Sequence, residues 1–527
     1  MKMRGSLTTL IVVIWLSSGA WAEVKLNPLF RGGAVLQRDM NVPVWGTAKE
    51  GEKVTVEFDG QTATTIAKEG KWMVHLKPHK AGGPFVLTVT GENTITLNNV
   101  LVGEVWVCSG QSNMQFELQF DANAAVESST ANYPKLRTFN VWRKNSVPLL
   151  AEVSPGKWSE CSPASSKYFT AVGYYFGRDL HKALDVPVGL IHSSYGATPA
   201  QAWTSLDGLE KEPKLQHYVE EAKKLAANFE KASATYPREL ADYQDKLKKW
   251  EAEVGVPYKE TLKAWTAENQ KNKQEGKPAI PQPKPVQPRP VEPISPNGHP
   301  TKATVLYNAM IAPLIPYAIR GVIWYQGENN AGNSPEYRTL FPRLIADWRE
   351  KWGQGDFPFL FVQVAPFNNL PPEIREAQLL TWQKTPNTAM AVITDAGDAT
   401  DIHPRHKEPV GVRLALAARA LAYGEKIEYS GPVFDALTID GDRAVLSFKH
   451  LGTGLVAKDG DLKGFTIAGA DMKFLAAKAG IQGDKVVVSS EQVREPVAVR
   501  YGWENVPDVN LFNKEGLPAS PFRTDVR

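Results

Sequence analysis

The chain has 527 residues and a mass of 58.1 kDa, more than one compact domain usually contains, so several domains are expected. Apolar residues make up 43% and charged residues 22%, a balance typical of globular proteins that excludes wholesale disorder or a fibrous repeat. Sixty basic and 57 acidic residues leave a net charge of +3, which gives no electrostatic signature of a nucleic-acid partner. Two cysteines, Cys108 and Cys161, exclude a disulfide-rich scaffold or a Cys-rich zinc site and leave a single bridge open.

The first 22 residues have the order of a secretory signal peptide. Lys2 and Arg4 precede an apolar stretch at 7–16, and the segment ends in the small-x-small sequence of residues 20–22, so cleavage is expected before Glu23. Ten apolar residues are too few to span a bilayer, and no later stretch is long and apolar enough for a transmembrane helix. The sequence therefore predicts an exported protein, periplasmic or secreted, without a membrane span after signal removal.

Two segments, 23–101 and 426–527, have the alternating pattern of half-buried strands. Turn dipeptides such as Asp-Gly separate the alternating runs. The pattern predicts a β-sandwich at each end of the mature chain. The runs that carry it include Val54, Val56 and Phe58 in the first segment, and Ala444, Leu446 and Phe448 in the second.

Between these segments, residues 102–205 and 301–425 alternate short apolar strands with amphipathic helices. Apolar strands followed by helices are typical of a mostly parallel sheet that is covered on both faces. The fold class expected is therefore α/β, with a doubly wound parallel sheet in a catalytic domain that is split into two parts.

A charged insertion at 206–300 separates the two parts of that domain. It holds 16 Lys or Arg and 15 Asp or Glu residues, and nine prolines lie between Pro278 and Pro300. Helical spacing of apolar residues predicts two helices that pair as a hairpin, and the proline-rich tract is expected to be extended and stiff. The segment is either a solvated insertion or an arm that binds a partner or shapes the substrate site.

Four predicted strands are each followed by a loop with polar side chains. In a doubly wound sheet such loops meet at the carboxyl ends of the strands and form the ligand crevice. Together they hold a serine, a glycine turn, amides, and a carboxylate with a histidine, which is the inventory of serine-based acyl transfer. The second glycine of the Gly-x-Ser-x-Gly elbow is missing. The loops begin at Cys108, His192, Tyr325 and Thr394.

Three of these loops resemble the blocks of a known family, the sialate O-acetylesterase group of the SGNH (GDSL-like) hydrolases, which are carbohydrate acetylesterases. The resemblance covers residues 26–205 and 301–425 and implies an SGNH-type three-layer sheet. The insertion is not part of it. The blocks are Gly110-Gln111-Ser112-Asn113-Met114, Trp324-Tyr325-Gln326-Gly327-Glu328 and Asp401-Ile402-His403-Pro404-Arg405.

The resemblance implies a role for each matched residue. Ser112 is the nucleophile, and its backbone N–H is one donor of the oxyanion hole. Gly196 supplies a second backbone N–H, and Asn330 a side-chain donor, with Gln326 as the competing amide. His403 is the general base that takes the proton of Ser112 and returns it to the leaving sugar alcohol.

The acid that orients His403 is less certain, because the superfamily pattern is Asp-x-x-His whereas here one residue separates the acid from the histidine. Asp401 is the first choice and Asp398 the second. A dyad in which a backbone carbonyl orients the imidazole is the third alternative.

The implied reaction removes O-acetyl groups from a sugar, either a sialic acid or an acetylated polysaccharide, and needs neither a metal nor an organic cofactor. Two other functions stay open. One is a glycoside hydrolase with Glu328 and an aspartate of the 395–401 loop as its carboxylate pair, and the other is a non-catalytic carbohydrate-binding protein. Candidates for stacking on sugar are Tyr195, Trp203, Trp324 and Tyr325, and candidates for holding a sugar carboxylate are Arg143 and Arg405.

Overall fold

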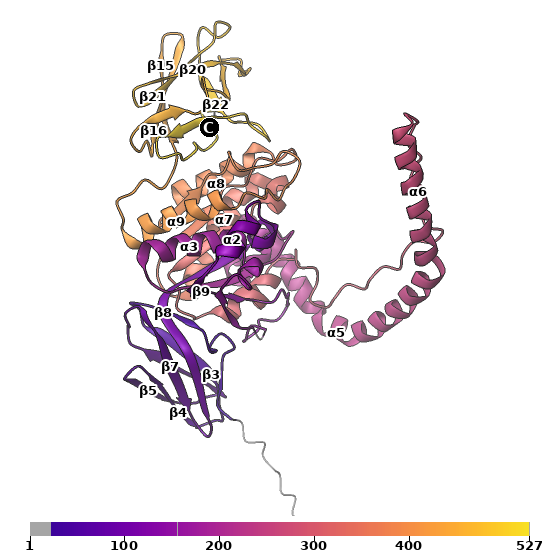
Figure 1. Ribbon diagram of the computed structural model, residues 1–527, viewed down its shortest axis with the longest axis vertical. Helices are drawn as coiled ribbons and strands as arrows, with labels where there is room; N and C mark the ends of the chain where they lie inside the picture. Colours follow the sequence, from indigo (N-terminus) through magenta and orange to yellow (C-terminus); the bar gives the residue numbers. More distant parts are fainter. Residues whose placement is uncertain (1–22, 155, 526–527) are drawn as a thin grey trace, which may run out of the picture.

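The computed structural model describes residues 23–525 except residue 155, so the predicted signal peptide lies outside the described residues. Figure 1 shows an N-terminal β-region, a central α/β body and a C-terminal β-region in a row, with a helical arm that projects from the central body. Among the described residues, no helix is long and apolar enough to cross a membrane.

The N-terminal region consists of two sheets packed on a common core. Strands β4 and β6 bury every second residue, and in β4 this confirms the alternation predicted for Val54, Val56 and Phe58. One sheet has the order β1–β3–β6, and in the other β5, β4, β7 and β8 are neighbours, with β2 beside β8. The strands are β1 (Lys25–Leu26), β2 (Val35–Gln37), β3 (Val42–Thr47), β4 (Lys53–Phe58), β5 (Gln61–Ile66), β6 (Lys71–Leu76), β7 (Gly82–Thr90) and β8 (Thr94–Gly110).

Strand β8 continues from this region into the centre of the large sheet. Its first half pairs with β7, and its second half pairs in parallel with β11 and β12. The strand order is β10–β9–β11–β8–β12–β13–β14, parallel except for β10, so the sheet is mixed. The other strands are β9 (Tyr133–Asn140), β10 (Trp158–Cys161), β11 (Val188–Ser194), β12 (Gly321–Tyr325), β13 (Phe359–Val362) and β14 (Thr388–Ala391).

Helices cover both faces of this sheet. On one face Trp106 and Cys108 of β8 share an apolar cluster with residues of α3 (Ala171–Leu184) and α9 (Glu408–Tyr423). On the other face Val105 and Val107 share a cluster with residues of α7 (Ser334–Trp352) and α8 (Pro372–Lys384). The α/β class with additional β-regions is thereby confirmed. Cys108 and Cys161 are both buried free thiols, so the bridge that the sequence left open is not formed.

The arm is the insertion at 206–300. The prediction that its helices pair as a hairpin is wrong. Helix α5 (Gln216–Trp250) passes through a π-helical turn at Glu251–Gly255 directly into α6 (Val256–Gln274), so the two helices form one curved rod (Figure 1). The proline-rich tract hydrogen-bonds to this rod. The indole N–H of Trp250 donates to the carbonyl of Gln287 at 3.0 Å, and that of Trp265 donates to the carbonyl of Ile280 at 2.9 Å. The partner of the rod is therefore the proline-rich tract and not a second helix.

The C-terminal region is built from small antiparallel sheets and docks on α8 through polar contacts. Arg523 pairs with Glu376 of α8 at 2.8 Å, and Ser520 accepts a hydrogen bond from the Gln363 side chain at 2.9 Å. The strands are β15 (Val433–Asp440), β16 (Arg443–Lys449), β17 (Leu455–Ala457), β18 (Phe465–Ala468), β19 (Leu475–Ala476), β20 (Lys478–Gln482), β21 (Lys485–Ser489), β22 (Ala498–Tyr501), β23 (Leu511–Asn513) and β24 (Phe522–Arg523).

The middle of β8 is fixed by a buried carboxylate. Glu104, fully buried, accepts hydrogen bonds from Arg320 at 2.8 Å and from Gln37 at 3.1 Å, and it also pairs with Arg38. Gln37 and Arg38 belong to the N-terminal region, whereas Arg320 directly precedes β12 of the central sheet. The carboxylate therefore connects the two bodies at the strand that they share.

We predict that Glu104→Ala lowers the free energy of unfolding by about 3 kcal/mol, because two arginines lose the carboxylate that compensates their burial. Urea denaturation followed by tryptophan fluorescence measures the change. Asp440→Ala removes the acid of an exposed ion pair with Arg443 and should cost no more than about 1 kcal/mol. Equal losses of unfolding free energy in the two variants would contradict the stabilising role that we give to Glu104.

Candidate active site

Ser112 lies at the point where β8 ends and the short helix α1 (Ser112–Gln115) begins. The turn requires a glycine at position 110, because φ is +135° there and a Cβ would lie 2.1 Å from the carbonyl oxygen of Tyr325. As the first residue of a helix, Ser112 has a backbone N–H with no acceptor inside the helix. The strand thus presents both the hydroxyl and a free amide donor at the carboxyl edge of the sheet.

His403 lies directly beside this serine. Its Nε2 is 2.8 Å from Oγ of Ser112, so the hydroxyl can donate to the imidazole in the tautomer that carries its proton on Nδ1. The carboxylate of Asp401 lies 3.7 Å from that Nδ1 and accepts the backbone N–H of His403 at 2.8 Å. The structure therefore brings together the predicted serine, histidine and first-choice acid, although the last contact is longer than a hydrogen bond.

Asp398, the second-choice acid, has a different role. Its carboxylate accepts hydrogen bonds from the backbone N–H groups of Thr400 and Asp401 and from the Thr400 hydroxyl, between 2.8 and 3.0 Å. These bonds lower the pKa of Asp398 and fold the loop that precedes the histidine. Asp398 is therefore a loop-forming residue, and Asp401 is the acid that faces the imidazole.

The predicted oxyanion-hole residues separate into two groups. Gly196 adjoins the nucleophile, since a Cβ on it would lie 3.4 Å from Cβ of Ser112, and its N–H donates to Oε1 of Gln115 at 2.9 Å. Asn330 is buried, and its amide is used by Ala200, Gln201 and Gln326 at distances between 2.7 and 3.0 Å. These bonds hold the Asn330 side chain in the loop packing, and its role as an oxyanion donor stays a prediction from the sequence.

Gln326, the competing amide, is also committed to the interior. It donates to Asn330 and to the carbonyl of Thr198, and it accepts from the hydroxyl of Tyr337 at 3.0 Å. Both of these amides therefore hold the loop after β12 against the loop after β11.

Asn329 is another amide beside these loops, and the sequence analysis did not single it out. Its backbone N–H donates to Oε1 of Gln111 at 3.3 Å, and its side-chain Nδ2 donates to the carbonyl of Ala197 at 3.1 Å. Those two partners immediately neighbour Ser112 and Gly196 in the chain. The signal in the sequence is the pair of adjacent asparagines after Glu328.

A buried polar cluster lies beneath the catalytic loop. Asn113 donates to Oε1 of Glu328 at 2.6 Å and to the carbonyl of Ile402 at 3.0 Å, and it accepts from Nζ of Lys407 at 2.5 Å. Burial lowers the pKa of Lys407 to about 7 and raises the pKa of Glu328. One residue from each of the three sequence blocks is thus joined directly below His403, which follows Ile402.

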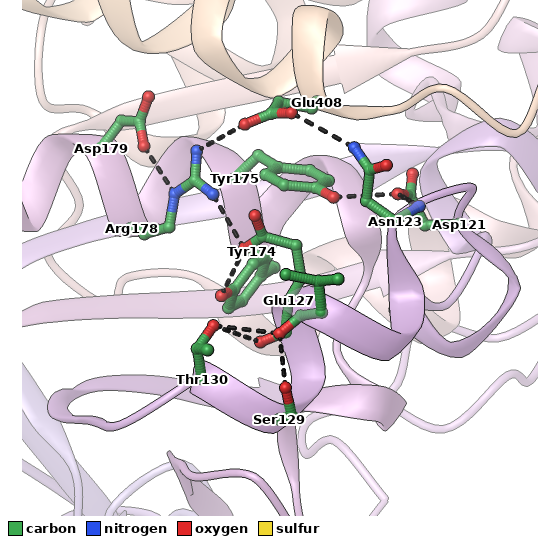
Figure 2. Close-up of polar contacts among 11 residues, drawn as sticks. Asp121, Asn123, Glu127, Ser129, Thr130, Tyr174, Tyr175, Arg178, Asp179 and Glu408 are labelled. Carbon is green, nitrogen blue, oxygen red and sulfur yellow. Dashed lines mark hydrogen bonds and ion pairs between the residues drawn. The ribbon is translucent and has the colours of Figure 1, made fainter.

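Figure 2 shows how the start of α9, which follows the catalytic loop, is anchored. Arg178 of α3 pairs with Glu127 at 2.9 Å and with Glu408, the first residue of α9, at 3.1 Å. Asp121 accepts the hydroxyl of Tyr175 and the backbone N–H of Lys407, both at 2.9 Å. These bonds fix the loop from His403 to Lys407 against α3, so the imidazole has a defined position above Ser112.

Comparison with known proteins finds carbohydrate acetylesterases. The profile of the family described as carbohydrate esterase, sialic acid-specific acetylesterase, matches residues 102–254 and 298–420. Sialate O-acetylesterases of rat and human are each 30% identical to the chain, over 98% and 97% of its length and 97% and 94% of theirs. A carbohydrate acetylesterase from Xanthomonas citri is 37% identical, with a TM-score of 0.77 over 96% of this chain and all of that one.

The chain belongs to the sialic acid-specific acetylesterase family of carbohydrate esterases. It is therefore a carboxylic ester hydrolase, and the two alternative functions are set aside. The geometry agrees, because Glu328 accepts a hydrogen bond from Asn113 and Asp398 is bonded to its own loop, so both carboxylates are held by the protein's own groups.

The esterase holds its serine and histidine in a cleft of about 470 Å³. Of the aromatic residues proposed from the sequence to stack on sugar, Trp203, Trp324 and Tyr325 are fully buried core residues, so that expectation is wrong for them. The residues that line the cleft are Ser112, Gln115, Phe116, Glu117, Gln119, Phe120, Asp401, His403 and Arg405.

The charges around His403 predict the acid limb of the pH profile. Burial and the charge of Lys407 lower the pKa of His403 below its usual value of about 6.5, while Asp401 raises it. A general base must be neutral, so kcat/KM should fall on acidification only below about pH 6.5. In Asp401→Asn the opposing charge is lost, so the limb should move to still lower pH and turnover should fall.

Asp398→Asn is the matched control for this profile, because that carboxylate contacts Thr400 and not the imidazole. Its acid limb should stay at the position of the unmodified enzyme. A shift in Asp398→Asn together with an unchanged limb in Asp401→Asn would reverse the assignment of the acid.

Proposed function

We propose that this esterase removes O-acetyl groups from sugars through an acetyl-serine intermediate on Ser112. The observation that carries the proposal is the 2.8 Å contact between Oγ of Ser112 and Nε2 of His403 inside an open cleft. A serine hydroxyl is a weak nucleophile until an adjacent base accepts its proton, and this geometry supplies the base. An SGNH-type arrangement is supported by the nucleophile at the end of a central parallel strand and by helices on both faces of the sheet.

In the first half of the reaction, Oγ of Ser112 attacks the acetyl carbonyl carbon while His403 takes the hydroxyl proton. The carbonyl oxygen becomes an oxyanion, and the imidazolium then gives its proton to the sugar oxygen as the C–O bond to the acetyl group breaks. In the second half a water molecule attacks the acetyl-serine by the same proton transfers, which releases acetate and restores the serine. Asp401, on the Nδ1 side, stabilises the imidazolium that forms in each half.

The oxyanion requires preorganised donors, and the candidates come from Ser112 itself, from Gly196 beside it and from Asn329, which bonds to the neighbouring residues of both. We propose that these are the backbone N–H groups of Ser112 and Gly196 and the side-chain amide of Asn329. In the structure Oε1 of Gln115 accepts the Gly196 N–H at 2.9 Å, so an anionic oxygen of the substrate would replace that amide oxygen. Gln115 would then turn into the cleft, which it lines.

The substrate class we propose is an O-acetylated carbohydrate, either a sialic acid or an acetylated polysaccharide. Mammalian relatives are named sialate O-acetylesterases, and the similar Xanthomonas citri protein is a carbohydrate acetylesterase. Arg143 and Arg405 remain the candidates for a sugar carboxylate. We also propose that the protein is exported, which rests on the signal-peptide pattern of residues 1–22.

The proposal predicts that Ser112→Ala and His403→Ala each lower kcat/KM for 4-nitrophenyl acetate and for an acetylated sugar by at least about 10³-fold. Acetate release is measured, together with the mass of the protein after rapid acid quenching, because an acetyl-serine adds one acetyl group. Ser129→Ala changes a serine whose hydroxyl only donates to the carbonyl of Val126, so it should retain full activity. Unchanged turnover in Ser112→Ala would refute the mechanism.

The two adjacent asparagines give a second prediction. Asn329→Ala should lower kcat by about 10²-fold with little change in melting temperature, because it removes a donor to the oxyanion. Asn330→Ala should instead lower the melting temperature, since it leaves the Ala200 N–H and the Gln326 amide without their buried acceptor. Steady-state kinetics and thermal unfolding of both variants separate these outcomes, and the opposite pattern would restore Asn330 as the donor.

A further inference from the structure

A second cleft adjoins the catalytic one and is not used by the chemistry described above. It has a volume of about 350 Å³ and shares Gln115 and Glu117 with the catalytic cleft, so the two form one continuous depression. It lies over the ends of β9 and β11, to one side of the nucleophile. The other residues that line it are Asn140, Val141, Trp142, Arg143, Tyr168, His192 and Ser194.

The exposed aromatic side chains of the protein gather at these two clefts. Among the described residues, the aromatic side chains classed as exposed are Phe120, Trp142 and Tyr168, at 54%, 67% and 52%. Phe120 lines the catalytic cleft, and Trp142 and Tyr168 line the second one. An exposed tryptophan contributes little to folding, and aromatic faces at the walls of a polar cleft are the usual means of binding the apolar faces of a ligand.

The rest of the second cleft suits a ligand rich in hydroxyl groups. No carboxylate of the described residues lies within ion-pair distance of Arg143, whose guanidinium instead lies over the ring of Tyr195 at 5.9 Å. The imidazole of His192 bonds to Asn140 and Ser194 at 3.1 and 2.6 Å, and burial lowers its pKa to about 4, so it is neutral. The cleft therefore offers the Arg143 guanidinium beside the neutral polar groups of His192 and its partners, with the Glu117 carboxylate at the edge shared with the catalytic cleft.

We propose that the second cleft is a binding site for the sugar ring next to the acetylated one, with Trp142 and Tyr168 against its faces and Arg143 donating to its oxygen atoms. The inference rests on the proposed function and extends it, because it makes an oligosaccharide or polysaccharide the preferred substrate over a free acetylated monosaccharide. The shared Gln115 and Glu117 lie where the two rings would be joined.

The test compares longer and shorter substrates that carry the same ester. We would measure kcat/KM for 9-O-acetylsialic acid and 9-O-acetylsialyllactose, and for acetylated methyl xyloside and acetylated xylotriose. The readout is kcat/KM for the longer glycan divided by kcat/KM for the shorter one. It is taken from whichever of the two pairs the enzyme hydrolyses faster. We expect this ratio to exceed one, and Trp142→Ala to lower it about tenfold, which corresponds to about 1.4 kcal/mol.

Tyr168→Ala and Arg143→Gln should lower the same ratio, so the inference does not depend on the folding of one variant. Val286→Ala, which shortens an exposed side chain on the distant arm, is the control and should leave the ratio unchanged. A ratio that stays at the unmodified value in all three cleft variants would overturn the inference. Failure of the proposed function is distinguished separately, since it would appear as activity that survives Ser112→Ala.

Discussion

The position of Ser112 depends on strand β8, whose middle is held by the buried carboxylate of Glu104. That side chain receives arginines from the N-terminal region and from the start of β12, so the two bodies cannot move independently without exposing unpaired charge. The same strand then ends in Gly110, where only a glycine can approach the carbonyl of Tyr325. A long rigid strand followed by an abrupt turn holds the nucleophile at a fixed height above the sheet.

The general base, His403, lies in an irregular loop and not at the end of a strand. Hydrogen bonds from buried polar side chains hold this loop in place. Asn113 bonds to the carbonyl just before His403, and Asp121 holds the N–H of Lys407 just after it. These groups are buried and therefore costly unless they are satisfied, which makes an alternative position of the loop unfavourable. The serine and the histidine are thus held by two sets of interactions that meet at Asn113, the neighbour of the nucleophile.

The sequence was sufficient to bring Ser112 and His403 together at one site, because loops that leave parallel strands must meet at the carboxyl edge of the sheet. It does not choose between Asn329 and Asn330 as the proposed oxyanion donor, since successive residues of a 3₁₀ turn point about 120° apart and periodicity does not tell which one faces inward. The predicted hairpin failed for a different reason. The apolar repeats that predicted its two helices lie within the single helix α5 (Gln216–Trp250), which continues through Pro237 without ending.

The long contact between Asp401 and His403 fits an enzyme whose site is completed by its substrate. Both side chains are substantially exposed, and at 3.7 Å in water their attraction is weak. A sugar that fills the catalytic cleft would exclude water from this pair and strengthen the attraction at the step in which the imidazolium forms. A longer glycan, held also by Trp142 and Tyr168, would exclude more water and hold the ester more firmly. Binding of the neighbouring ring would therefore contribute to the rate of acetyl transfer as well as to affinity.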